Sequence, residues 1–227
     1  MDGGRSNSDM PNEQLLAPTF LFRFSAPLLR RKTIWSKSGI QLEKKYTLPS
    51  FGELEDRPLF ADVRGAWNES GLAFHVRVTG KKQLPWCRGT RLEDSDGLNL
   101  WIDTRDTHNI HRASRFCHRF IVLPGGGGRR LDEPVAQLVT INRARENPKE
   151  VASKALEVRS EKRVDGYILQ VFIPAGALTG FDASEHPRLG FSYAVVDREL
   201  GWQTFSVGPE FPFLEDPSLW GTLELNV

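Results

Sequence analysis

The segment from residue 71 to residue 78 alternates apolar and other side chains without interruption. One face of this repeat carries four apolar residues, Leu72, Phe74, Val76 and Val78. The other face carries Ala73, His75 and Arg77. A period of two residues is typical of a β-strand that buries one face. The repeat therefore predicts a half-buried strand over residues 71–78, and the fold must supply a second layer to cover it.

Shorter runs of the same kind recur along the chain, separated by turn-forming pairs such as Asp165-Gly166. They predict strands over residues 98–103, 116–123, 138–142, 156–160, 167–173, 189–196 and 221–227. Helical signal is limited to one or two turns over residues 147–154. So many short strands with very little helix predict an all-β fold, an antiparallel β-sandwich of the jelly-roll type.

The length of the chain, 227 residues, suits a single large β domain, because such folds often remain undivided at this size. Residues 1–18 are rich in small polar residues and offer nothing to bury. We therefore predict a disordered N-terminal tail over residues 1–18 and one β-sandwich domain over residues 19–227. The two cysteines, Cys87 and Cys117, predict buried reduced thiols rather than a disulfide framework.

The charges of the chain nearly cancel, with 30 Lys and Arg against 29 Asp and Glu. Such a balance supplies no field that would attract nucleic acid or a membrane surface, so neither is expected as a partner. No apolar run approaches the ~20 residues of a membrane-spanning helix. The polar start lacks the apolar stretch of a secretory signal, which predicts a cytoplasmic protein. If an upstream signal is missing from this sequence, the protein is expected to be exported.

The second half of the chain carries motifs in a fixed order. They are a Gly-aromatic strand that ends in Ile-Pro (166–174), a Gly-Phe strand that ends in Asp (190–197) and a closing Trp-Gly-x-Leu strand (220–223). Residues 94–103 add an acidic lead-in and a strand that ends at Asp103. This pattern resembles the carbohydrate-binding modules of family 9 over about residues 60–227, most strongly after residue 160. One position departs from it, since Gln170 stands where a Glu is usual.

The resemblance implies a jelly-roll-like sandwich that binds carbohydrate between aromatic side chains and polar groups, with a part in carbohydrate breakdown. It also implies structural calcium, for which Asp94 and Asp96 are the candidate ligands. An EF-hand is not the source of such a site, because Arg105 stands where the bidentate Glu would be needed. The alternative is that residues 94–97 form an ordinary turn before a strand.

Sugars present flat C–H faces and a ring of hydroxyls, so their sites need exposed aromatic rings beside planar polar groups. Three tryptophans are the candidates for the rings: Trp101, on the face of its strand opposite the core, and Trp86 and Trp202, in loops. Polar contacts to the ligand are predicted for Asn99, Asp103, Arg105, His108 and His111. The alternative is that a loop buries Trp101 and that Arg–Asp pairs hold the stretch 103–120 to the sandwich.

The histidines of the stretch 103–120 would also suit zinc, but the arginines among them repel a divalent cation. Arginine and histidine together favour sugar hydroxyls or an anionic group such as a uronate or a phosphate.

Three functions stay open, in decreasing order of support. The first is a non-catalytic domain that binds a saccharide or a similar polyhydroxylated ligand. The second is a structural or protein-interaction sandwich that has lost sugar binding. The third is a small saccharide-acting enzyme, for which glycoside hydrolysis by two carboxyl groups would be the chemistry. The sequence contains no Gly-x-Ser-x-Gly nucleophile elbow in support of the third.

Overall fold

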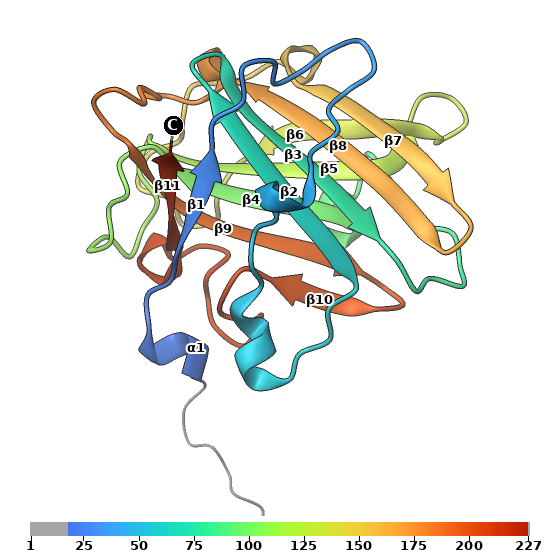
Figure 1. Cartoon of the computed structure of the whole chain (residues 1–227), viewed down its shortest axis with the longest axis horizontal. Coiled ribbons are helices and arrows are strands. Elements are labelled where there is room, and N and C mark those ends of the chain that lie inside the picture. The colour runs from blue at the N-terminus through green and yellow to red at the C-terminus, as the bar shows by residue number, and fades with distance from the viewer. Residues whose placement is uncertain (1–17, 227) are drawn as a thin grey trace, which may run out of the picture.

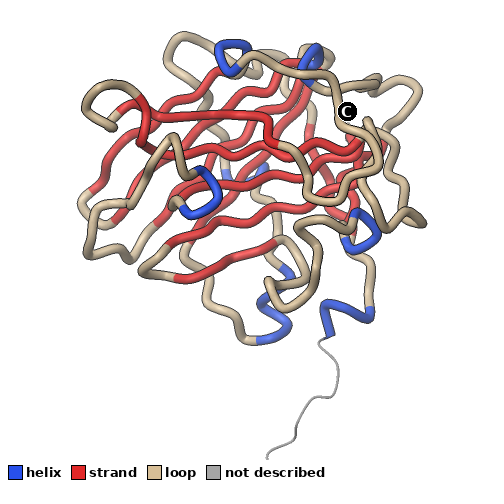
Figure 2. The backbone as a smooth tube through the Cα atoms, turned by 180° about the vertical axis from the view of Figure 1, so that it is seen from behind, coloured by secondary structure: helices blue, strands red, loops and turns tan. Residues whose placement is uncertain are grey.

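Two β-sheets packed face to face form the protein, as a computed structural model describes it over residues 18–226 (Figure 1). The elements are α1 (Pro18–Leu21), β1 (Ser25–Leu29), β2 (Ala61–Asn68), β3 (Gly71–Val78), β4 (Gly97–Asp103), β5 (Cys117–Gly127), β6 (Glu133–Val139), β7 (Glu157–Arg163), β8 (Gly166–Pro174), β9 (Arg188–Asp197), β10 (Gly201–Thr204) and β11 (Gly221–Asn226). Single 3-10 turns and loops connect them, mostly at the ends of the strands (Figure 2). Within these residues, no helix is long and apolar enough to cross a membrane.

The larger sheet has seven strands in the order β1-β11-β9-β4-β5-β6, with β10 paired to β9 beyond the end of β11. The smaller sheet has four strands in the order β2-β3-β8-β7. Neighbouring strands run antiparallel except β1 and β11, which are parallel. The predicted antiparallel β-sandwich is therefore confirmed, with one parallel pair added at an edge.

The core lies between the sheets, and β3 contributes to it as its alternation predicts. Its four apolar residues, Leu72, Phe74, Val76 and Val78, are fully buried. Phe74 stacks on Phe191 of β9, with 5.9 Å between ring centroids and an interplanar angle of 4°, so aromatic contact joins the two sheets. Burial of each such side chain stabilises the fold by ~1.5–3 kcal/mol.

Several predicted elements differ in their bounds. The strand expected to end before Pro124 continues as β5 to Gly127, with a shift of register after Leu123. The strand expected over 138–142 is β6, which ends at Val139, and the helical turns expected over 147–154 reduce to a 3-10 turn at Ser153–Ala155. The predicted tail lies outside the described residues, except that residue 18 already begins α1.

Residues 30–48, which the sequence left unassigned, cover the outer face of the smaller sheet. Their apolar side chains Ile34, Ile40, Leu42 and Tyr46 pack on Ala66 and Ala73. Gln170 of β8 fixes this segment, because its side-chain oxygen accepts a hydrogen bond from the Ile40 amide at 3.3 Å. The side-chain amide of Gln170, which stands where a Glu is usual, therefore has a structural partner.

Both cysteines are buried free thiols, as predicted. Burial raises the pKa of Cys87 and of Cys117 to about 12, so neither is a thiolate at neutral pH.

Candidate functional site

The outer face of the seven-stranded sheet is covered at one end by the loop 205–220. This loop packs Phe213 and Trp220 against Trp101 of β4. Trp101 is 0% exposed, and its indole N–H donates a hydrogen bond to the Leu214 carbonyl at 3.1 Å. Its ring is closed to any ligand, which corrects its prediction as a stacking platform. The covering loop considered as the alternative describes this residue.

Asn99 and Arg119 form a polar strip beside Trp101 on the same outer face. The Arg119 guanidinium lies 5.3 Å from the Trp101 ring centroid and donates to Asn99 Oδ1 at 3.2 Å and to Glu93 Oε1 at 2.5 Å. Burial lowers the pKa of Arg119, while the Glu93 charge acts in the opposite direction. Asn99 is 4% exposed, so its side chain already serves an internal contact.

The polar residues that follow β4 build the loop in which they lie. The carboxylate of Asp103 accepts hydrogen bonds from the Arg105 amide at 3.0 Å and the Thr107 amide at 2.7 Å. The Arg105 guanidinium donates to the Gly180 carbonyl at 2.7 Å and lies 4.3 Å from the Phe116 ring centroid. Asp103 is 1% exposed and structural here, which corrects its prediction as a ligand contact, and Arg105 holds the same loop to the segment at Gly180.

The two predicted histidines of this stretch also pair within the protein. His108 Nε2 lies 2.9 Å from an Asp106 carboxylate oxygen. His111 Nδ1 lies 3.1 Å from Asp216 Oδ2 and 3.1 Å from Ser218 Oγ. In a catalytic triad, the serine and the aspartate contact different nitrogens of the imidazole, whereas here both contact Nδ1. The Ser218 hydroxyl donates its hydrogen bond to Asp216 rather than to the imidazole. This Ser–His–Asp group is structural, because Asp216 caps the 3-10 turn Pro217–Leu219 by accepting a hydrogen bond from the Ser218 amide.

A depression enclosing about 440 Å³ opens where β4 begins. Its lining residues are Lys81, Gln83, Leu84, Pro85, Trp86, Arg88, Asp96, Arg198 and Glu199. We call it the Trp86 depression. Two segments meet there: the loop before β4, closed by the Asp96 amide donating to the Trp86 carbonyl at 2.9 Å, and the hairpin between β9 and β10.

The floor of the Trp86 depression is a buried ammonium group among carboxylates. Lys81 Nζ lies 2.7 and 2.6 Å from the two oxygens of Asp197, 3.4 Å from Asp96 Oδ2 and 3.7 Å from Glu199 Oε2. The side chains of Lys81, Asp96 and Asp197 are at most 2% exposed. Burial alone would lower the pKa of Lys81, but the hydrogen bond to Asp197 and the two carboxylate charges raise it overall.

The predicted calcium ligands do not converge. Asp94 pairs with Arg91 at 2.7 Å, whereas the oxygens of Asp96 accept from the amides of Trp86 and Arg198 and face Lys81. Over residues 18–226, no three His, Cys, Asp or Glu side chains are placed to hold a metal ion. The donors present do not fit calcium, because a lysine ammonium takes the cation's place.

Trp86 stands at the rim with its indole half-buried. The guanidinium carbon of Arg198 lies 3.6 Å from its ring centroid, and those of Arg88 and Arg91 lie 5.5 and 5.7 Å away. Trp202 is also half-buried, and it pairs in register with Val196 of β9, which is opposite Gly97 of β4. Trp202 therefore belongs to β10 rather than to the predicted loop, and it packs against the cluster around Trp101. Of the three predicted tryptophans, Trp86 is the one that lines the depression.

We call Lys81 together with Asp96, Asp197 and Glu199 the Lys81 cluster. The sequence analysis predicted neither this cluster nor the arginines around Trp86. Arg88 and Arg91 follow Trp86 closely in the sequence, and this proximity was an available signal. Arg198 reaches Trp86 only through the pairing of β9 with β4, which no local pattern reveals.

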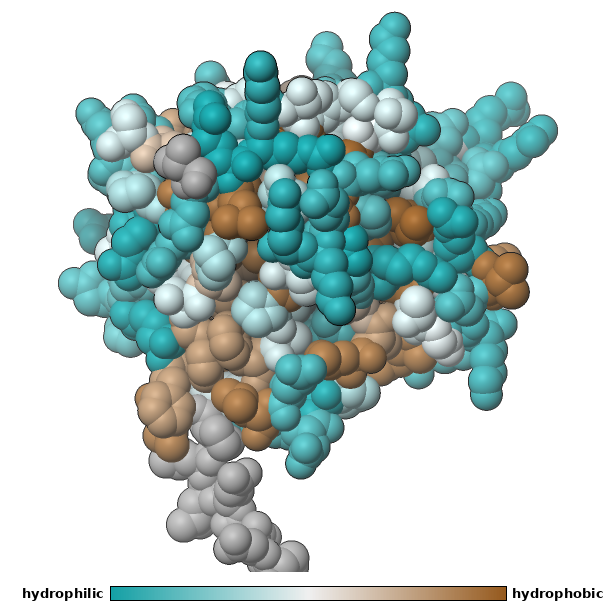
Figure 3. Space-filling view, viewed as in Figure 1, coloured by the Kyte–Doolittle hydropathy of each residue, from teal (hydrophilic) through white to brown (hydrophobic). Residues whose placement is uncertain are grey.

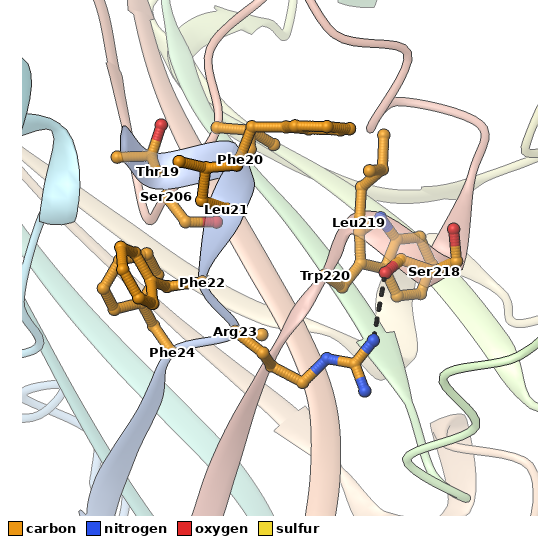
Figure 4. Close-up of a pocket in the computed structure, with 12 residues that line it drawn as sticks. Thr19, Phe20, Leu21, Phe22, Arg23, Phe24, Ser206, Ser218, Leu219 and Trp220 are labelled. Carbon is orange, nitrogen blue, oxygen red and sulfur yellow. Dashed lines mark hydrogen bonds between the residues drawn. The ribbon is translucent and has the colours of Figure 1, made fainter. Parts of the chain in front are cut away.

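A second depression, of about 240 Å³, lies beside α1 (Figure 4). Phe20 stacks on Phe211 there at 4.7 Å, and Arg23 reaches the Ser218 carbonyl at 3.4 Å. The adjacent side chains of Phe20, Leu21 and Phe22 are 43%, 57% and 64% exposed. Figure 3 shows an apolar area at the lower edge of the molecule, where α1 lies in the same view in Figure 1. With few charged groups facing it, this depression suits a polyhydroxylated ligand less well.

Comparison with known proteins identifies the fold. No protein-family model and no curated protein sequence matches the chain. A carbohydrate-binding module of family 9 from Caldicellulosiruptor kristjanssonii, solved with cellotriose, superposes with a TM-score of 0.58 at 10% identity over 89% of this chain and 94% of its own. Its complex with glucose gives the same TM-score and identity.

A protein from Bacteroides uniformis proposed to bind carbohydrate superposes with a TM-score of 0.53 at 12% identity, over 90% of this chain and all of its own. The fold implied by the resemblance is therefore confirmed. At these identities the likeness establishes architecture, and the function has to be argued from the residues.

Proposed function

We propose that this domain binds a saccharide in the Trp86 depression and performs no catalysis. The observation that carries the proposal is a half-buried indole at the rim of a depression of about 440 Å³, beside amide, guanidinium and carboxylate groups. Small-ligand sites typically enclose ~300–1,000 Å³ and combine an apolar wall with a few fixed polar groups. The shared fold supports this proposal, because two of the similar structures hold cellotriose and glucose.

The walls of the depression are fixed before any ligand arrives, which favours binding. The Lys81 cluster ties the loop before β4 to the β9–β10 hairpin, since it joins Asp96 to Asp197. Glu199 extends this link by accepting from the Lys82 and Gln83 amides at 2.9 and 3.1 Å. Prior ordering of the walls reduces the entropy lost on binding.

A non-catalytic role is supported by the state of the reactive groups. Both thiols are held protonated, and the Ser218–His111–Asp216 group lacks the geometry that activates a nucleophile.

A titration calorimetry screen against mono- and oligosaccharides tests the proposal. We expect Kd values in the micromolar to millimolar range and a loss of binding in Trp86→Ala. Trp35→Ala is the matched control, because Trp35 is also half-buried but lies over the four-stranded sheet and bonds Glu157 at 2.7 Å.

Absence of binding to every saccharide at millimolar concentration would refute the proposal. The protein-interaction function would then take its place, and the exposed side chains of α1 would be the surface to examine. Binding that survives Trp86→Ala unchanged would place the site elsewhere.

A further inference from the structure

The indole of Trp86 is already engaged by a cation. Arg198 lies 3.6 Å from the ring centroid, a distance at which the guanidinium stacks on the ring face. A neutral sugar that stacked on this face would have to displace the guanidinium and lose the cation–π attraction. A ligand that binds the edge of the guanidinium would leave the stack intact.

The N–H groups of two arginines at this rim are largely unused. Across residues 18–226, the Arg198 side chain has no hydrogen bond or salt bridge, and the Arg88 guanidinium donates only to the neighbouring Cys87 carbonyl at 3.0 Å. Both residues are exposed, whereas Arg91 is paired with Asp94. Planar, fixed and unpaired guanidinium groups match an oxyanion in a bidentate manner.

The acidic residues nearby do not pair with the guanidinium groups of Arg88 and Arg198 at the rim. Asp96 and Asp197 point to the floor, where both face the single ammonium of Lys81. Glu199 accepts from two backbone amides, and Glu93 pairs with Arg119 on the outer face. The carboxylates are thus occupied below or beside the depression, while Arg88 and Arg198 face the solvent above it.

We propose that the Trp86 depression selects an acidic saccharide, one whose carboxylate, phosphate or sulfate group binds Arg198 and Arg88 while its hydroxyls meet the polar wall. This inference rests on the proposed function and narrows its ligand class. Trp86 then serves to hold Arg198 in position rather than to stack on the sugar.

The test is titration calorimetry at low and high salt with glucose, glucuronate, glucose 6-phosphate and glucose 6-sulfate, and with acetate and inorganic phosphate alone. At least one acidic sugar should bind about tenfold or more tightly than glucose, with an affinity that falls as salt rises. The acidic sugar that binds most tightly shows whether the site prefers a carboxylate, a phosphate or a sulfate group. Arg198→Ala should remove the preference, and Arg198→Lys should restore it in part, because an ammonium cannot form the bidentate contact.

Arg163→Ala is the control, an exposed arginine on the four-stranded sheet that pairs with Glu161 at 2.9 Å. Far-ultraviolet circular dichroism and thermal unfolding check that each variant folds. Equal affinity for glucose and the acidic sugars, lost in Trp86→Ala, would overturn this inference and leave the proposed function standing. Binding of acetate or phosphate as tight as that of the sugar would also overturn it. If no saccharide binds, both proposals fail.

Discussion

The loop after β4 and the Trp86 depression are both rich in charged side chains, yet they use them in opposite ways. In the loop, Asp103, Arg105 and His108 each bond a neighbouring part of the protein. In the depression, the buried groups at the floor bond one another, and Arg88 and Arg198 at the rim keep free N–H groups. Unpaired polar groups held on an ordered backbone therefore indicate a binding site better than a dense run of polar residues does.

The largest effect on stability is expected when the cation is removed from the floor of the depression. Lys81→Met leaves Asp96 and Asp197 buried without their counter-ion, so we expect a loss of about 5 kcal/mol in the free energy of unfolding. Urea denaturation measures it. The exposed neighbour gives the control, Lys82→Met, which should change stability by less than ~0.5 kcal/mol. A loss below ~1 kcal/mol in Lys81→Met would show that the cluster does not hold the depression together.

Trp101 and Trp86 should respond differently to removal of the indole. Trp101→Ala should cost about 4 kcal/mol, because a fully buried indole and its hydrogen bond to Leu214 are lost. Trp86→Ala should cost much less stability, since half-buried Trp86 contacts mainly exposed arginines, while abolishing saccharide binding. The two denaturation curves should therefore differ clearly. Equal losses would contradict the assignment of Trp101 to the core and Trp86 to the site.

The dependence of stability on acid pH tests whether the buried imidazole of His118 in β5 is neutral in the native state. His118 is fully buried, accepts a hydrogen bond from the Thr179 amide at 2.8 Å, and has its pKa lowered by burial from 6.5 to about 4. The unfolded chain takes up this proton first as pH falls, so the stability is complete above pH 6.5 and is lost as pH drops through 4. The loss should reach ~3 kcal/mol.

Unfolding measured between pH 7 and 4 checks this expectation, with His118→Gln as the comparison. Glutamine does not titrate, so the variant should lose less stability than the wild type over the same range. Parallel pH profiles would contradict a neutral buried imidazole in the native state.

The smallest effect is expected at the exposed end of the loop. His111→Ala should alter the free energy of unfolding by less than ~0.5 kcal/mol, because its side chain is 78% exposed and its contacts compete with water. Saccharide affinity should also be unchanged. A large loss of binding in this variant would move the site away from the Trp86 depression.

The fold could be predicted from the sequence where one face of a strand meets the core. β3, β8 and β9 follow their patterns because their alternate residues are buried between the sheets. β1, β2 and β10 were missed, since their positions depend on pairing with distant strands, as in the parallel match of β1 with β11. Local periodicity carries no information about such partners.

The candidate site could be predicted only in part. Trp86 lines it from a loop, whereas Trp202 lies in β10 and packs with the buried cluster around Trp101, which could not be placed from its strand alone. Its side chain does point away from the main core, and only the fold shows that the loop 205–220 covers it. The pairing of Lys81 with Asp197 joins residues 116 positions apart, beyond the reach of any motif.

The Lys81 cluster also determines how the depression depends on its surroundings. A bound metal ion leaves its site when its free concentration falls well below its Kd, whereas the Lys81 ammonium is attached to the chain and cannot dissociate from it. The loop before β4 and the β9–β10 hairpin are therefore joined as soon as the sheet forms. This junction therefore contains no counter-ion that a chelator could remove.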